Sequence, residues 1–159
     1  MAEKDKTCIC ERLGMIYGFD QPLLVRRKLA AKEKGVVYHA NVVPERETAV
    51  FQVDGKIITE GNKCDKLVLS QEVGLKGSWR GHFIELKGTD VRHAVAQLES
   101  TINHAVFKDD SLSLKFARIV ARSFPSSKAD PFFEKARAKF KKEYSCELKT
   151  LKSGQDDLI

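Results

Sequence analysis

Residues 82–107 read HFIELKGTDVRHAVAQLESTINHAVF, and this stretch carries the strongest signal in the chain for how the protein folds. It begins with a short apolar run that predicts a β-strand from His82 to Leu86. Asp90 follows as a predicted N-cap, and apolar residues then recur at helical spacing up to about Phe107. A strand followed at once by an amphipathic helix is typical of a sheet that has helices packed against it.

The segment near the start of the chain also has the composition of a helix. Residues 22–34 consist mainly of good helix formers, including leucine, alanine, arginine and lysine. Asp20 suits an N-cap, Pro22 falls in the first turn and Gly35 offers a stop. A helix with a basic side is therefore expected over 22–34.

The remaining strands are expected from short runs rich in β-formers. These runs cover residues 36–43, 49–53, 63–69 and 111–122. Pro44 ends the first run, and Asp54-Gly55 predicts a two-residue hairpin turn with residues 56–59 returning as a strand.

The C-terminal part predicts one more helix, from Pro131 to Tyr144, and a frayed segment over 154–159. The predicted order is therefore helix, strands, helix, strand, helix. This order indicates an α/β (α+β) fold, in which helices flank a mixed central β-sheet. A length of 159 residues suits a single domain over 1–159.

Composition limits the classes of partner. The chain is 42% hydrophobic and 31% charged, as in soluble globular proteins, and its formal net charge is +6. This basic excess favours a polyanionic partner such as nucleic acid. No apolar run is long enough for a membrane helix and no secretory leader is evident, so we expect no membrane contact and a cytoplasmic location with reduced thiols. Cys8 and Cys10 could offer two zinc ligands, but two small residues near a terminus is the more ordinary interpretation.

The predicted strand over 82–86 suggests a site, because residues two apart share one face of a strand. Glu85 and Lys87 therefore share a face, while Ile84 and Leu86 share the other and are expected to pack under the following helix. A carboxylate can hold Mg²⁺, and a neighbouring lysine can orient water or offset charge on a phosphate. On the preceding strand, Asp65 is the expected second acid. The backbone carbonyl of Leu86 is the expected third oxygen ligand.

These residues carry a resemblance to a known family. Asp65, nineteen intervening residues and then Glu85-Leu86-Lys87 resemble the motif of the PD-(D/E)XK nuclease superfamily, although Cys64 stands where the family has proline. The resemblance implies a restriction-endonuclease-like core of helix, three strands, helix and strand over about 22–122. A helical, basic extension would follow over about 130–152. Some members add a glutamine on the helix after the motif, which implies a site role for Gln97.

The resemblance implies a metal-dependent nuclease that hydrolyses phosphodiester bonds in DNA with Mg²⁺ or Mn²⁺. In this interpretation Asp65 and Glu85 hold the metal, Lys87 positions water, and a homodimer spans a duplex. One alternative is a non-catalytic module on the same scaffold that binds nucleic acid or protein. Another is an unrelated α/β protein whose basic charge serves only solubility. The ordinary interpretation of Glu85 and Lys87 alone is an exposed ion pair on the outer face of a sheet. Trp79 with Arg80 could contact nucleic acid, or Trp79 could cover part of the core.

Overall fold

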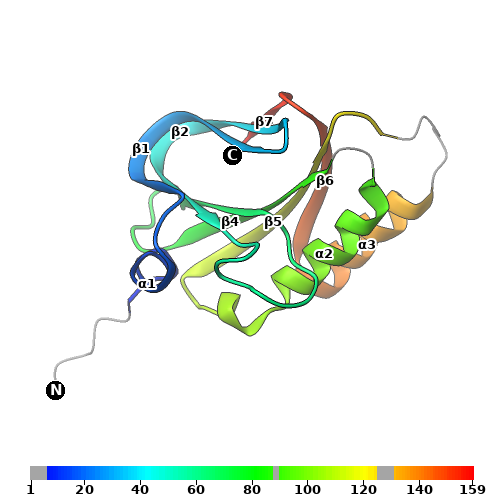
Figure 1. Cartoon of the computed structure of the whole chain (residues 1–159). Helices are drawn as coiled ribbons and strands as arrows, with labels where there is room; N and C mark the ends of the chain where they lie inside the picture. Colours follow the sequence, from blue (N-terminus) through cyan, green and yellow to red (C-terminus); the bar gives the residue numbers. More distant parts are fainter. Residues whose placement is uncertain (1–6, 88–89, 125–130) are drawn as a thin grey trace, which may run out of the picture.

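The computed structural model describes residues 7–87, 90–124 and 131–159 (Figure 1). Three α-helices, one 3-10 helix and seven strands occur in these residues. In chain order they are α1 (Ile9–Tyr17), β1 (Gln21–Glu33), β2 (Val36–Gln52), β3 (Lys66–Gln71), β4 (Trp79–Lys87), α2 (Val91–Ile102), η1 (Ala105–Phe107), β5 (Leu112–Ala121), α3 (Pro131–Tyr144), β6 (Cys146–Lys152) and β7 (Asp156–Leu158).

All seven strands belong to one mixed sheet. The strand order is β1-β2-β3-β4-β5-β6, and β7 pairs with β2 off this path. The strands β1 to β4 form an antiparallel series, whereas β5 runs parallel to β4 and β6 runs parallel to β5. Helix α2 makes the crossover between the parallel strands β4 and β5. Parallel neighbours end at the same edge, so the C-terminal ends of β4 and β5 lie side by side.

Two apolar cores lie on the two faces of this sheet. The first core joins the sheet to the helices, and it includes Leu13 of α1, Leu98 of α2 and Phe140 of α3. The second core lies under the β1–β2 hairpin and includes Tyr38 and Val120. Figure 1 shows this arrangement, with the hairpin and β7 arched over one side of the sheet and α2 and α3 on the other.

A buried ion pair fastens the hairpin layer to the sheet. Asp157 of β7 accepts hydrogen bonds from Arg118 Nε at 2.8 Å and from the Tyr38 hydroxyl at 2.7 Å. The side chains of Arg118 and Asp157 are each only 2% exposed. These contacts join β5, β7 and β2, so the second core is closed by residues far apart in the chain.

The expected helix over 22–34 is wrong, because these residues form strand β1. Here β1 pairs with β2 from Gln21 to Glu33, and the pairing overrides the local helix propensity. The expected stop at Gly35 belongs instead to the hairpin turn, where Lys34 has φ 48° and Gly35 has φ 77°. The first helix is α1, which lies earlier in the chain.

Four further expectations need correction. Strand β2 continues through Pro44 instead of ending there, and residues 56–59 form turns in place of a strand, with only an isolated bridge between Asp54 and Ile58. Residues 154–159 are not frayed, because β7 pairs with β2 and Ile159 is buried in the second core. Asp90 precedes α2, but its side chain makes no cap hydrogen bond.

Other expectations are confirmed. The strand expected over 111–122 is β5, the helix expected from Pro131 to Tyr144 is α3, and the helix after the opening strand is α2 followed by η1. The protein is therefore a mixed α/β structure with a seven-stranded sheet and helices on one face. Within the described residues, every helix is too short or too polar to cross a lipid bilayer.

Candidate functional site

Strand pairing brings Asp65 opposite Glu85. The antiparallel register of β3 and β4 pairs Lys66 with Ile84, so the residue before Lys66 faces the residue after Ile84. The backbone N–H of Asp65 donates to the carbonyl of Ile84 at 3.1 Å, which extends the ladder by one step. The two acids predicted from sequence therefore lie together at the end of β4.

A backbone hydrogen bond fixes the Asp65 carboxyl group, and burial governs that of Glu85. The N–H of Leu86 donates to Asp65 Oδ2 at 2.8 Å, so Leu86 contacts the site through its amide nitrogen. Burial raises the pKa of Glu85 to about 10, helped by a side-chain hydrogen bond to Asp65 and by the negative charge of Asp65. The carboxyl of Glu85, only 1% exposed, thus holds a proton at neutral pH.

Lys87 and Gln97 complete the predicted set. The positive charge of Lys87 lowers the pKa of Glu85, against the larger effect of burial. Gln97 of α2 lies across from the strand, and its Nε2 donates to the carbonyl of Lys63 at 3.2 Å. Two buried acceptors here, Glu85 Oε2 and Gln97 Oε1, have no hydrogen-bond partner among the described residues. Buried polar atoms without partners are rare and often mark a place for an ion or water.

All four predicted side chains, Asp65, Glu85, Lys87 and Gln97, line one cavity of about 370 Å³ at this end of the sheet. The other charged residues of its lining, which are Glu33, Lys34, Asp54 and Arg122, were not among the predicted site residues. Arg122 follows the end of β5, and the rule that parallel strands end at a common edge was the signal that could have found it. Glu33 had a signal, since some members of the superfamily add a glutamate from the first helix, but its place near the end of the expected helix spoke against it. Lys34 had no such signal, because it reaches the cavity only through the hairpin.

Elements on both faces of the sheet line the cavity, with the β1–β2 hairpin on one face and α2 on the other. Phe83 packs in the first core while Ile84 and Leu86 pack in the second, so Glu85 points to the helix side. The expectation that Ile84 and Leu86 pack under the following helix is therefore wrong, since the β1–β2 hairpin covers them. The hairpin therefore covers the face of the sheet opposite to the helices.

Helix α2 also holds the loop that precedes β3. Thr101 is fully buried, and its hydroxyl accepts a hydrogen bond from the N–H of Cys64 at 2.8 Å and donates to the carbonyl of Gln97 at 2.7 Å. With the bond from Gln97 to Lys63, two side chains of α2 fasten the residues just before Asp65. The position of Asp65 therefore depends on α2 as well as on β4.

The oxygen set fits a hard divalent cation of the Mg²⁺ type. Magnesium is commonly bound through one or two carboxylates and keeps several waters, so Asp65 and Glu85 are sufficient protein acids. Among the described residues no group of three or more histidine, cysteine, aspartate and glutamate side chains is arranged to hold a metal ion. The fit therefore rests on two carboxylates and the unpartnered amide oxygen of Gln97.

The possible zinc ligands near the start of the chain have no such support. All four cysteines are free, and burial raises the pKa of Cys10 to about 12, so its thiol stays protonated. Zinc binds thiolates. Cys10 instead packs in the first core.

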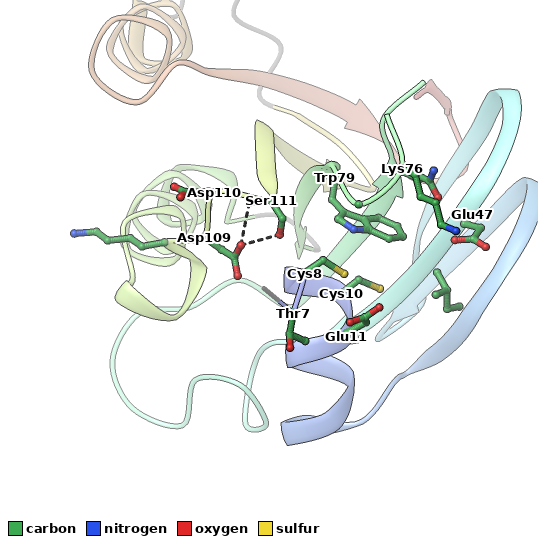
Figure 2. Close-up of a pocket in the computed structure, with 14 residues that line it drawn as sticks. Thr7, Cys8, Cys10, Glu11, Glu47, Lys76, Trp79, Asp109, Asp110 and Ser111 are labelled. Atoms are coloured by element: carbon green, nitrogen blue, oxygen red, sulfur yellow. Dashed lines mark hydrogen bonds between the residues drawn. The ribbon is translucent and has the colours of Figure 1, made fainter. Parts of the chain in front are cut away.

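A larger cavity of about 1020 Å³ lies at the opposite end of β4, beside Trp79. Figure 2 shows Cys8, Cys10 and Trp79 around it, with Asp109 hydrogen bonded to Ser111 on one side. Its charges are of both signs, and Asp109 is also paired with Arg12. Size alone favours this cavity, but the buried acid Glu85, with an oxygen that has no hydrogen-bond partner among the described residues, lies in the smaller one, which we therefore take as the candidate site.

The remaining residues of interest have structural surroundings. Trp79 is 3% exposed in the first core, and Arg80 donates twice to Glu72, so Trp79 covers the core. His82 is buried, stacks on Phe116 at 4.8 Å and lies away from the cavity lining. Burial lowers the pKa of His82 to about 3, so its ring is neutral.

No family model, no curated protein and no solved structure matches this chain. The case for a function therefore rests on the chemistry of the residues themselves.

Proposed function

We propose that the protein is a metal-dependent nuclease of the PD-(D/E)XK type, which hydrolyses phosphodiester bonds in DNA. The observation that carries the proposal is the cavity in which Asp65 faces Glu85 beside Lys87, with a buried carboxyl oxygen that has no partner in the described part of the chain. A buried acid with no cationic partner is costly, and perturbed acids of this kind gather at functional sites.

The order of elements supports the same family. The C-terminal half of β2, then β3 and β4, forms an antiparallel series, and α2 and the parallel strand β5 follow. Apart from the additional strand β1 between α1 and β2, this follows the expected order of three strands, helix and strand. Asp65 comes directly before the second of these strands, and the Glu-x-Lys pair ends the third. Helix α1 stands before the strands, where the expected first helix was misplaced at 22–34.

Each residue has a role that its position allows. Asp65 and Glu85 would hold Mg²⁺ or Mn²⁺, and Gln97 would add a neutral oxygen from α2. When bound, the metal would make a water more acidic and offset the negative charge of the phosphate. The charge of Lys87 acts on Glu85, whose pKa it lowers. From this position the Lys87 ammonium would orient the attacking water and stabilise negative charge that develops on a phosphate oxygen. Glu85 would have to give up its proton to hold such a cation.

The test is cleavage of plasmid DNA and labelled oligonucleotides with Mg²⁺ and, separately, with a chelator. We expect cleavage only with the metal, and a loss of about 100-fold or more in Glu85→Gln and Lys87→Met, the range seen when one stabilising group is removed. The matched controls Glu60→Gln and Lys142→Met change exposed residues outside the cavity and should keep full activity.

Two results would count against the proposal. One is the absence of cleavage of any nucleic acid by the wild-type protein, and the other is full activity in both site variants. Salt-sensitive binding of DNA without cleavage would favour the non-catalytic module on the same scaffold.

A further inference from the structure

The tip of the β1–β2 hairpin forms one wall of the candidate site. Glu33, Lys34 and Val36 line the cavity from this side, while Gln97 of α2 lines it from the other. Lys34 and Gly35 both have positive φ, so the chain reverses in a tight two-residue turn and the tip stays narrow. The wall is therefore a single turn of backbone placed across the end of the sheet.

This wall is anchored to the body of the protein. Arg122 Nη2 donates to the carbonyl of Lys34 at 2.6 Å, and a Cβ placed on Gly35 would lie 3.0 Å from the same nitrogen. Behind the tip, Val36 is 1% exposed in the second core, and Val37 donates to Ser153 Oγ at 2.9 Å. Moving the hairpin aside would break these contacts, so the cavity keeps both walls.

The reactive groups lie at the bottom of this enclosed space. Glu85 is buried, and the cavity of about 370 Å³ is near the lower end of the range for ligand pockets. In a duplex, the phosphates lie on a convex surface and each strand is paired to its complement. The backbone of a duplex therefore does not bend into a narrow recess. A single strand can unstack and turn its backbone into a recess, as in enzymes that act on extruded or unpaired nucleotides.

The cations of the cavity lie where they can contact such a strand. Lys34, Lys87 and Arg122 line the cavity beside its acids, and both Lys34 and Arg122 are exposed. Lys34 comes from the hairpin and Arg122 from the end of β5. Neither belongs to the oxygen set proposed to hold the metal, so both are available to bind phosphate. Exposed lysine and arginine side chains at a site entrance bind phosphate and release counterions.

We propose that the substrate of this site is single-stranded DNA, with Lys34 and Arg122 binding a phosphate next to the one that is cleaved. This inference rests on the proposed function, since it names the substrate form of the same cavity. From the sequence we expected a homodimer that spans a duplex. The substrate is instead a single strand, which enters the cavity between the hairpin tip and α2.

The experiment compares one labelled oligonucleotide as a single strand with the same oligonucleotide annealed to its complement as a blunt duplex, both with Mg²⁺. Cleavage of the single strand at least about 100-fold faster than the duplex supports the inference. A loss of this size is expected when the phosphate of the substrate is not positioned at the reacting groups. Equal or faster cleavage of the duplex overturns it and leaves the nuclease proposal standing. Cleavage of neither form removes both.

A charge variant tests the role of the hairpin tip separately. Lys34→Asn keeps a residue that tolerates positive φ and removes the ammonium, so we expect KM for the single strand to rise about tenfold with kcat little changed. The salt dependence of binding should weaken by about one counterion. Lys32→Asn is the matched control, since Lys32 is exposed on the same hairpin but does not line the cavity. An equal effect in both variants, or none in Lys34→Asn, would contradict the assigned role.

Discussion

Two buried carboxyl groups in this protein have opposite surroundings. Asp157 accepts hydrogen bonds from Arg118 and Tyr38, so its charge is compensated inside the protein. Glu85 is equally buried, but burial and the neighbouring charge of Asp65 raise its pKa to about 10, and one of its oxygens has no partner among the described residues. The Asp157 carboxylate is therefore stabilised as a charged group by its partners. The Glu85 carboxyl is stabilised in its neutral form, and ionising it would destabilise the folded protein.

The difference separates stability from function. A paired buried charge strongly destabilises the fold when one partner is removed, because the other partner is left unpaired. A buried acid that lacks a cation already carries a cost, and replacing it with a neutral group relieves that cost. The two sites should therefore respond to neutralising mutations with opposite signs.

The largest expected effect is at the paired site. Asp157→Asn removes the buried partner of Arg118 and leaves the half-exposed Glu147, 3.0 Å from Nη2, as its remaining ion pair. We therefore expect a loss of about 3 kcal/mol in the free energy of unfolding, the lower end of the range for a broken buried pair. Chemical denaturation measures this loss. The control is Asp156→Asn, because Asp156 is 61% exposed in its pair with His39 and should cost about 1 kcal/mol or less. Equal losses in the two variants would contradict the importance given to the buried pair.

The second prediction concerns Glu85 and pH. Its pKa is raised from 4.5 to about 10, so between these values the folded protein binds one more proton than the unfolded chain. The stability tied to this proton is complete below pH 4.5 and is lost as pH rises toward 10. Glu85→Gln removes the dependence, and its stability relative to wild type should rise by about 1.4 kcal/mol for each pH unit in this window.

Unfolding at several pH values with a chelator present measures this difference. Glu60→Gln, at an exposed site, should follow the wild-type curve. If the free energy of unfolding depends on pH in the same way for wild type and Glu85→Gln, then Glu85 is ionised in the folded protein. Glu85 would then not differ from Asp157 in its charge state.

The smallest expected effect concerns how the acid pair is held. Thr101→Val leaves the N–H of Cys64 without its acceptor, so we expect a loss of about 1–2 kcal/mol and weaker Mg²⁺ binding by calorimetry, with Thr101→Ser restoring both. Thr48→Val is the matched control, because Thr48 is also fully buried and accepts a hydrogen bond from Arg26. If both variants weaken Mg²⁺ binding equally, the position of Asp65 does not depend on Thr101.

The sequence predicted the fold well wherever one periodicity dominates. The strand at 82–86, the helix at 131–144 and the strand at 111–122 each have a pattern that tertiary contacts reinforce. Residues 22–34 failed because leucine, alanine, arginine and lysine favour a helix locally, while the pairing of β1 with β2 decides the outcome. Strand β7 was missed because three residues are too few for any pattern, and only its contacts with β2 order it.

The candidate site followed the same rule. Glu85 and Lys87 were found from strand alternation, and Asp65 from the strand before, because an antiparallel pair with a short connection has a predictable register. Gln97 followed from the helix after the motif, and it does line the cavity. Lys34 could not be found in this way, since its place depends on where a long hairpin ends in space. Arg122 could have been found, because it follows β5, whose C-terminal end lies beside that of β4.

The pairing of β7 with β2 also affects how the protein is made. Tyr38 and Asp157 are separated by 119 residues, and contacts at such a distance along the chain form late and slowly. During synthesis on the ribosome, the apolar inner face of the hairpin emerges long before the residues that seal it. Until then this face is exposed to other chains, so the β1–β2 hairpin is the segment of the nascent protein most in need of a chaperone.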